Sequence, residues 1–195
     1  MRLFLIRHAS VEYTRDSATN RYIDLSSRGT TQAVQMADLW EQPIDCLYSS
    51  RLPRALQTIA PLSAKVSLPA IEDSGLVELD YRGDAALFHT EIVGNRDFKF
   101  KGGESIDEAN HRFFSTLKKI AERHPASAVA VSTHGTVLSE FCVQQFGFPK
   151  DFFFTVSYPD IFEIEYTNDA GFNFIRRVVD FLPETSENAH IICSK

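Results

Sequence analysis

The sequence is poor in cysteine and has no long apolar run. Its 195 residues include three cysteines, two methionines and one tryptophan. Cys46, Cys142 and Cys193 are odd in number and lack the spacing of metal ligands, so we expect no metal site and a reducing, cytoplasmic location. No stretch approaches the length of a membrane span, and the N-terminus has no signal-peptide pattern. We therefore expect no membrane partner.

Positive charge is also in short supply. The formal net charge is −6, which argues against a general surface for nucleic acid or anionic lipid. An anion-binding site would have to be a local group of basic side chains. The length and a hydrophobic content of 44% predict one domain, residues 1–195, with a sizeable core.

Short apolar runs alternate with amphipathic segments along the chain. The pattern predicts strands at residues 2–7, 45–48, 128–132, 161–167 and 172–181, and helices at residues 28–40, 51–60, 106–120 and 135–146. A capping box, Ser105 with Glu108, opens the third helix. The first and third strands are almost wholly apolar, as expected of buried parallel strands. The fourth alternates apolar and polar residues and precedes a turn, which predicts a terminal antiparallel hairpin near a sheet edge.

These elements predict an α/β fold. We expect a three-layer sandwich with a mostly parallel sheet, helices on both faces and an antiparallel edge strand. Histidines directly follow two of the apolar strands, in Arg7-His8 and in Ser132-Thr-His134. Open α/β sheets bind ligands at the carboxyl ends of their strands. Two histidines and an arginine there indicate a site for an anion such as phosphate.

Further motifs lie between the two histidines. In chain order they are Leu25-Ser-Ser-Arg-Gly29, Tyr48-Ser-Ser-Arg51-Leu-Pro-Arg54, Leu76-Val-Glu78 and Gly102-Gly-Glu-Ser105. Together with the histidine motifs, their order and spacing resemble the histidine phosphatase superfamily, the phosphoglycerate-mutase-like proteins. The resemblance runs from residue 1 to about residue 146.

The resemblance implies a metal-independent phosphomonoesterase, a histidine acid-type phosphatase with a phosphohistidine intermediate. His8 would be the nucleophile, Arg7 and Arg54 would bind the phosphate, and His134 would stabilise charge on its oxygens. Glu78 would be the general acid and base. The expected partners are a small phosphorylated metabolite and inorganic phosphate, with no cofactor and no nucleic acid.

Elementary chemistry adds two expectations about these groups. An attacking imidazole needs its other nitrogen held as N–H, and a backbone carbonyl in the turn after His8 would serve. Glu78 lies between apolar neighbours, whose burial of the carboxyl group would raise its pKa. Asp80 would share the face of Glu78 in a strand, so it is an alternative proton donor.

Several positions are expected to shape substrate binding. Ser10, Thr14, Arg51, Gly135 and Thr136 are candidate substrate contacts, Arg51 because its spacing from Arg54 would bring both to one helical face. Residues 80–103 could form a partial lid over the site. Ala9 occupies a position where the family most often has glycine, so a positive φ there would strain the backbone.

Three alternative functions stay open at this point. The first is a phosphoglycerate-mutase-type phosphotransferase, although the short chain and the run Val77-Glu78-Leu79-Asp80-Tyr81 depart from the mutase pattern. The second is a phosphoprotein phosphatase, including one for phosphohistidine. The third is a non-catalytic phosphate-binding module, which the presence of both histidines and both arginines argues against.

Overall fold

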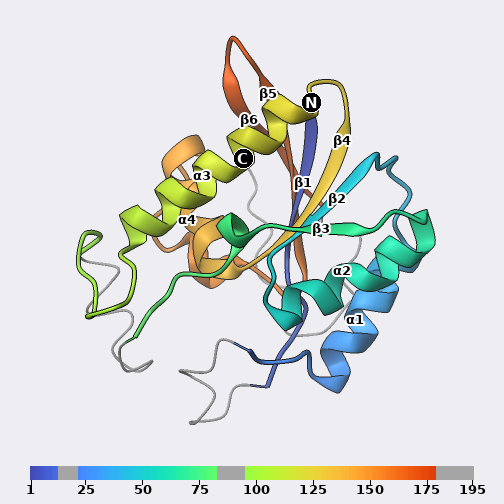
Figure 1. Ribbon diagram of the computed structural model, residues 1–195, viewed down its shortest axis with the longest axis horizontal. Helices are drawn as coiled ribbons and strands as arrows, with labels where there is room; N and C mark the ends of the chain where they lie inside the picture. The colour runs from blue at the N-terminus through green and yellow to red at the C-terminus, as the bar shows by residue number, and fades with distance from the viewer. Residues whose placement is uncertain (13–21, 83–94, 179–195) are drawn as a thin grey trace.

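The computed structural model describes residues 1–12, 22–82 and 95–178, except for the side chains of residues 153 and 154. Within these residues a six-stranded sheet has the order β3-β2-β4-β1-β5-β6 (Figure 1). The strands are β1 (Arg2–Arg7), β2 (Cys46–Ser49), β3 (Ala70–Glu72), β4 (Ala128–Thr133), β5 (Asp160–Thr167) and β6 (Gly171–Val178). The first four pair in parallel, and β5 is antiparallel to both β1 and β6. The predicted terminal hairpin is confirmed.

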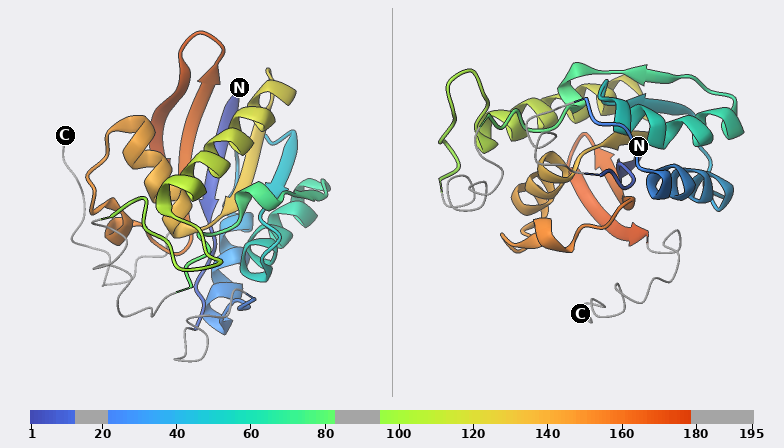
Figure 2. Two further views of the ribbon diagram at one scale, coloured as in Figure 1. Left: turned by 60° about the vertical axis from the view of Figure 1, so that its left-hand side comes forward. Right: turned by 90° about the horizontal axis from the view of Figure 1, so that it is seen from below.

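Helices cover both faces of this sheet, as Figure 2 shows. Two of them, α1 (Ser27–Asp38) and α2 (Pro53–Val66), pack on one face, and α3 (Ile106–Arg123) and α4 (Gly135–Phe146) pack on the other. The connections within the described residues contain the short 3₁₀ helices η2 (Ser74–Leu76) and η5 (Phe152–Thr155). The predicted three-layer α/β sandwich is confirmed.

Strand β1 is buried on both faces. Leu3 and Leu5 join the apolar cluster under α3 and α4, whereas Phe4 and Ile6 join the cluster under α1 and α2. All four side chains are fully buried. This two-sided burial explains why the sequence of β1 is apolar throughout instead of alternating.

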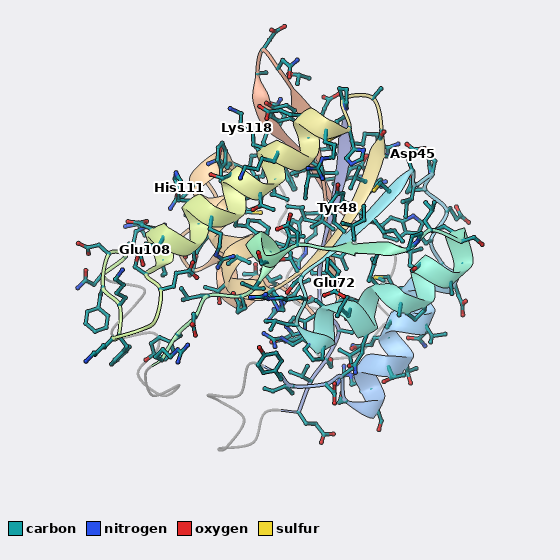
Figure 3. All side chains as sticks on the ribbon, viewed as in Figure 1. Asp45, Tyr48, Glu72, Glu108, His111 and Lys118 are labelled. Carbon is teal, nitrogen blue, oxygen red and sulfur yellow. The ribbon has the colours of Figure 1, made fainter. Side chains whose placement is uncertain are left out.

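Helix α3 shows how closely local sequence can specify an element. The hydroxyl of Ser105 accepts from the amide of Glu108 at 3.1 Å, and the Glu108 carboxylate accepts from the amide of Ser105 at 3.1 Å. This reciprocal capping box is the one predicted. Glu108, His111 and Lys118 are exposed along the outer face of the helix (Figure 3), while residues such as Phe113 and Leu117 face the core.

The predicted bounds of helix α2 were wrong at both ends. The helix begins at Pro53, after an extended Leu52, because proline disfavours helical geometry in the preceding residue and suits the first helical position. It also continues through Pro61 to Val66. Core packing of Ile59 and Leu62 on either side of Pro61 outweighs the single hydrogen bond that proline cannot make.

Other departures are smaller. Helix α1 ends at Asp38 instead of residue 40, and the three-residue edge strand β3 was not predicted. Strand β6 is described as far as Val178, so residues 179–181 of the predicted last strand lie outside the described residues. A three-residue strand with two exposed side chains has too little apolar pattern to be recognised from sequence.

Candidate active site

The carboxyl ends of β1, β2 and β4 lie side by side in the parallel part of the sheet (Figure 1). The amide of His8 donates to the carbonyl of Thr133 at 2.9 Å, so the ends of β1 and β4 that carry the two histidines are adjacent. The ring centroids of His8 and His134 are 5.3 Å apart. The two histidines, separated by 126 positions in the sequence, are therefore brought to one site.

The ring of His8 is held by a different partner at each nitrogen. Its Nδ1 is 2.8 Å from the carbonyl oxygen of Ala9, which accepts and so places the ring proton on Nδ1. Its Nε2 then has the lone pair and accepts from the Nε–H of Arg54 at 3.1 Å. The carbonyl expected in the turn after His8 is that of Ala9.

His8 is also kept neutral by its surroundings. The residue is only 2% exposed. Burial, followed by the positive charge of Arg54, lowers the pKa of His8 well below its usual value. The hydrogen bond to the Ala9 carbonyl opposes this shift, and the charge of Arg7 adds a smaller lowering effect. A neutral imidazole whose Nε2 carries no proton is the nucleophilic form.

The turn after His8 is fixed to helix α2. The amide of Ala9 donates to the hydroxyl of Thr58 at 2.9 Å, and that hydroxyl donates to the carbonyl of Arg54 at 2.7 Å. Among the described residues other than glycine, only Ser67 has a positive φ. Ala9 therefore has an ordinary backbone conformation, and the strain considered for it is absent.

Arg7 is buried, at 5% exposure, and held by the segment that precedes β5. One terminal nitrogen donates to the carbonyl of Val156 and is 3.5 Å from the carbonyl of Ser157. The guanidinium also lies 3.6 Å from the centroid of the Tyr158 ring. The same ring lies 5.4 Å from that of His8, so Tyr158 contacts both groups.

An ion pair between Asp160 and Arg177 stabilises this segment. Asp160 is 2% exposed, and its carboxylate accepts from both Nε (2.9 Å) and a terminal nitrogen of Arg177. It also accepts from the amide of Ser157 at 2.8 Å. Arg177 in turn donates to the carbonyl of Thr155 at 2.7 Å. The pair thereby fixes the backbone that holds Arg7.

His134 lies at the N-cap position of α4 and is fully buried. Its Nε2 is 2.7 Å from the hydroxyl of Ser50, the residue that follows β2. That hydroxyl also accepts from the amide of Leu52 at 3.2 Å. Ser50 thus orients the imidazole from the neighbouring strand.

The carboxylate of Glu78 binds the first turn of α4. Its Oε2 accepts from the amide of Thr136 at 3.0 Å, and its Oε1 accepts from the amides of Val137 at 3.2 Å and Leu79 at 2.9 Å. All three donors are backbone amides, and two of them belong to the first turn of α4. The amides that bind Glu78 follow His134, the N-cap of α4, by two and three residues, so the carboxylate lies close to the histidine site. The side chain is half-buried, not fully enclosed as its apolar neighbours suggested.

Asp80 has a different environment. Its two carboxylate oxygens accept from Arg82, at 3.0 Å from Nε and 2.9 Å from a terminal nitrogen. Residues 77–80 form no strand, so the face that Asp80 was expected to share with Glu78 does not exist. Of the two carboxylates, it is that of Glu78 that binds the first turn of α4, next to His134.

The remaining predicted positions are in several environments. Ser10 fixes a turn through its backbone, whose amide donates to Gln32 at 3.0 Å and whose carbonyl accepts from Ser26. Gly135 lies against the guanidinium of Arg7, and Thr136 holds Glu78. Arg51 is exposed in the bend before α2, so it shares no helical face with Arg54. Thr14 and residues 83–94 of the predicted lid lie outside the described residues.

Sequence reasoning missed three contributors to this site. Ser50 belongs to the motif that begins at Tyr48, and it follows the predicted strand at residues 45–48 by two positions. This position at a strand end could have identified it as a site residue. Thr58 had a weaker signal, one helical turn after Arg54. Tyr158 had none, because it meets Arg7 across about 150 residues of chain.

The site concentrates positive charge in an acidic protein. Arg7 and Arg54 are both 5% exposed. The guanidinium of Arg54 donates to His8, and that of Arg7 lies against Gly135 at the N-terminus of α4. This arrangement suits a phosphate dianion, whose oxygens pair with the planar fork of arginine. Among the described residues, no group of three or more His, Cys, Asp or Glu side chains is placed to hold a metal ion. No helix in the described segments is long and apolar enough to cross a membrane.

The fold and this site define a phosphate-handling α/β protein. The model of the histidine phosphatase superfamily (branch 1) matches residues 3–178, and the chain belongs to that family. The predicted resemblance is confirmed.

Relatives with assigned names are similar over about two thirds of the chain. Phosphoserine phosphatase 1 of Hydrogenobacter thermophilus is 28% identical over 152 residues, which are 69% of this chain and 71% of that protein. The metal-independent phosphoserine phosphatase of Arabidopsis thaliana is 29% identical over 155 residues, 70% of this chain and 65% of that protein. Among solved structures, phosphoserine phosphatase of Entamoeba histolytica with 3-phosphoglyceric acid has a TM-score of 0.74 and 17% identity, covering 93% of this chain and 99% of that one.

Proposed function

We propose that the protein is a metal-independent phosphomonoesterase of a small phosphorylated metabolite, acting through a phosphohistidine on Nε2 of His8. The observation behind it is the pair of hydrogen bonds on that ring. The carbonyl of Ala9 keeps the proton on Nδ1, and the guanidinium of Arg54 lies at the lone pair of Nε2. A phosphate bound to Arg54 would therefore meet the nucleophilic nitrogen. Similarity to phosphoserine phosphatases supports a hydrolase of small monoesters.

In the first step Nε2 attacks phosphorus, the N–P bond forms and the P–O bond to the leaving group breaks. The leaving alkoxide takes a proton from the carboxyl group of Glu78. Arg7, Arg54 and His134 stabilise the charge on the phosphoryl oxygens, as preorganised donors do in such transition states. The amides of Thr136 and Val137 stabilise the carboxylate that remains.

In the second step that carboxylate removes a proton from water. The water oxygen attacks phosphorus, the N–P bond breaks and its electron pair returns to Nε2 of His8. Inorganic phosphate leaves, and Glu78 is protonated again for the next cycle. On the basis of a histidine nucleophile with a carboxyl proton donor, we propose the histidine acid-type class. We propose a cytoplasmic location, supported by the free thiols of Cys46 and Cys142.

The decisive experiment is a rapid chemical quench with a ³²P-labelled monoester. Label should appear on His8 in a form that is stable to base and labile to acid, and His8→Ala should lose both the label and turnover while the fold survives. A screen of phosphorylated metabolites, with phosphoserine and 3-phosphoglycerate included, identifies the substrate. Equal turnover by His8→Ala would contradict the proposal, and phosphoryl transfer to a second metabolite in place of water would show a mutase.

A further inference from the structure

We propose that Arg112 of α3 is a positioning residue for Glu78, an inference that rests on the proposed role of Glu78 as the proton donor and acceptor. One terminal nitrogen of Arg112 donates to the carbonyls of Gly75 and Val77, at 2.8 and 2.9 Å. Its Nε and other terminal nitrogen donate to the two carboxylate oxygens of Glu104, at 2.8 and 2.7 Å. The side chain thus binds the backbone directly before Glu78.

The segment that leads to Glu78 has little secondary structure of its own. It is a single 3₁₀ turn, η2, followed by irregular chain. Three successive carbonyls in it are bound by side chains from outside: Arg112 binds those of Gly75 and Val77, and Thr133 donates to that of Leu76 at 2.9 Å. Side chains of α3 and β4 therefore set the path of this backbone.

Helix α3 also determines how closely this segment packs against it. A Cβ on Gly75 would lie 1.9 Å from the hydroxyl oxygen of Thr116, one turn after Arg112, so the backbone there lies directly on the helix. From this surface Glu78 extends to the amides of Thr136 and Val137 in α4. The carboxylate is thus held between two helices, its backbone by α3 and its oxygens by α4.

The pairing with Glu104 determines how Arg112 acts. A bidentate carboxylate neutralises the guanidinium, so the influence on Glu78 is exerted through geometry and not through an unbalanced charge. Glu104 is also bound to the other side of the segment, because its amide donates to the carbonyl of Asp80 at 3.0 Å. The planar fork of arginine serves two carbonyls and a carboxylate together, which the single ammonium of lysine cannot do.

The test compares leaving groups. A general acid contributes about 10²–10⁴-fold with a poor leaving group and little with a good one. Arg112→Gln should therefore lower kcat/KM for an alkyl phosphate by roughly 10-fold or more beyond any loss with 4-nitrophenyl phosphate, since small displacements of catalytic groups are costly. Arg112→Lys, which keeps the positive charge, should show the same selective loss to a smaller extent and serves if Arg112→Gln does not fold.

Arg96→Gln is the matched control. Arg96 also forms a half-buried ion-paired contact with α3, at 3.0 Å from Asp107, and pairs with Glu140 of α4, but these contacts do not involve residues 75–78. It should leave the ratio of the two substrates unchanged. In the background of Glu78→Gln, the change Arg112→Gln should leave that ratio where Glu78→Gln alone puts it.

Two results would overturn the inference, and they are distinguishable. If Glu78→Gln shows the selective loss but Arg112→Gln and Arg112→Lys slow both substrates equally or not at all, Arg112 is only structural and the role of Glu78 stands. If Glu78→Gln itself shows no selective loss, the assignment of Glu78 is wrong and the positioning role of Arg112 is lost with it.

Discussion

The backbone of Gly135 lies directly against the guanidinium of Arg7. A Cβ at Gly135 would be 2.9 Å from the Cζ, Nε and a terminal nitrogen of Arg7. The guanidinium has little freedom to move away, because Val156 binds one end and Tyr158 covers one face. A glycine at the first position of α4 is therefore required for Arg7 to occupy the site.

Gly135→Ala should consequently reduce phosphate binding more than stability. Alanine is a better helix former than glycine, so the helix itself gains, but the methyl group displaces the guanidinium. We expect kcat/KM to fall by about 10²-fold, the loss typical of one misplaced charge-stabilising donor. Steady-state kinetics and thermal unfolding of the same preparation check this. Wild-type kinetics in Gly135→Ala would show that Arg7 adjusts freely.

The two buried arginines should each be needed for anion binding. Arg7→Ala or Arg54→Ala should lower kcat/KM by about 10²–10³ and weaken inhibition by vanadate to a similar degree. Lys118→Ala, which removes an exposed positive charge from the far part of α3, is the control and should leave both unchanged. Undiminished vanadate inhibition in both arginine variants would mean that the anion binds elsewhere.

The buried neutral histidine predicts a pH dependence of stability. Burial and Arg54 lower the pKa of His8 in the folded protein below its unfolded value, so the unfolded state binds the extra proton first. Stability is therefore fully present above pH ~6.5 and falls as pH decreases from there, by at most about 1.4 kcal/mol per pH unit.

Urea unfolding at pH 7 and pH 5.5 measures this effect. His8→Asn should reduce the difference between the two pH values, whereas His111→Asn, at an exposed position of α3, should leave it as in the wild type. An unchanged difference in His8→Asn would show that other groups cause the acid destabilisation.

Glu78 and Asp80 can be separated by the chemistry of the leaving group. Glu78→Gln should slow alkyl phosphates by about 10²–10⁴-fold more than nitrophenyl phosphate, because only the alkoxide needs a proton. Asp80→Asn should cause a mild, uniform loss, since its carboxylate is engaged by Arg82. Selective loss in Asp80→Asn alone would reverse the two assignments.

Activity should withstand chelation. The positive charge that a phosphate needs is supplied by Arg7, Arg54 and the end of α4, so extensive treatment with EDTA should leave kcat unchanged. The matched sample is the same enzyme dialysed without chelator. An absolute requirement for added Mg²⁺ or Mn²⁺ would exclude the proposed mechanism.

Much of the fold could be predicted because the relevant signals are local. The apolar run of β1 and the capping box of α3 each lie within a few residues, and both were interpreted correctly. The bounds of α2 could not be predicted, because Pro61 reads as a helix terminator. The helix continues beyond Pro61 because its neighbours Ile59 and Leu62 pack in the core, which the sequence does not show.

The strand-end histidines are the part of the site that is most readable from sequence. Parallel pairing of β1 with β4 follows from their apolar character, and it brings His8 and His134 together. Asp80 shows where prediction from sequence failed. It was considered as an alternative proton donor because a strand would have placed it on the same face as Glu78, but residues 77–80 form no strand. The pairing of Asp80 with Arg82 and the extension of Glu78 to α4 distinguish the two carboxylates in space alone.

The sequence by itself determined the family and the layered α/β architecture, because short motifs and local periodicity indicate both. The same motifs contain the two histidines and two arginines that the structure brings together. Only the tertiary structure decided how those groups are held. Arg7 depends on Tyr158 and on the Asp160–Arg177 pair, and Glu78 depends on α3 and α4. These contacts join residues far apart in the chain. They exist only after the strands have paired, because the geometry of a hydrogen bond is set by where folding places the two partners and not by the spacing between them in the sequence.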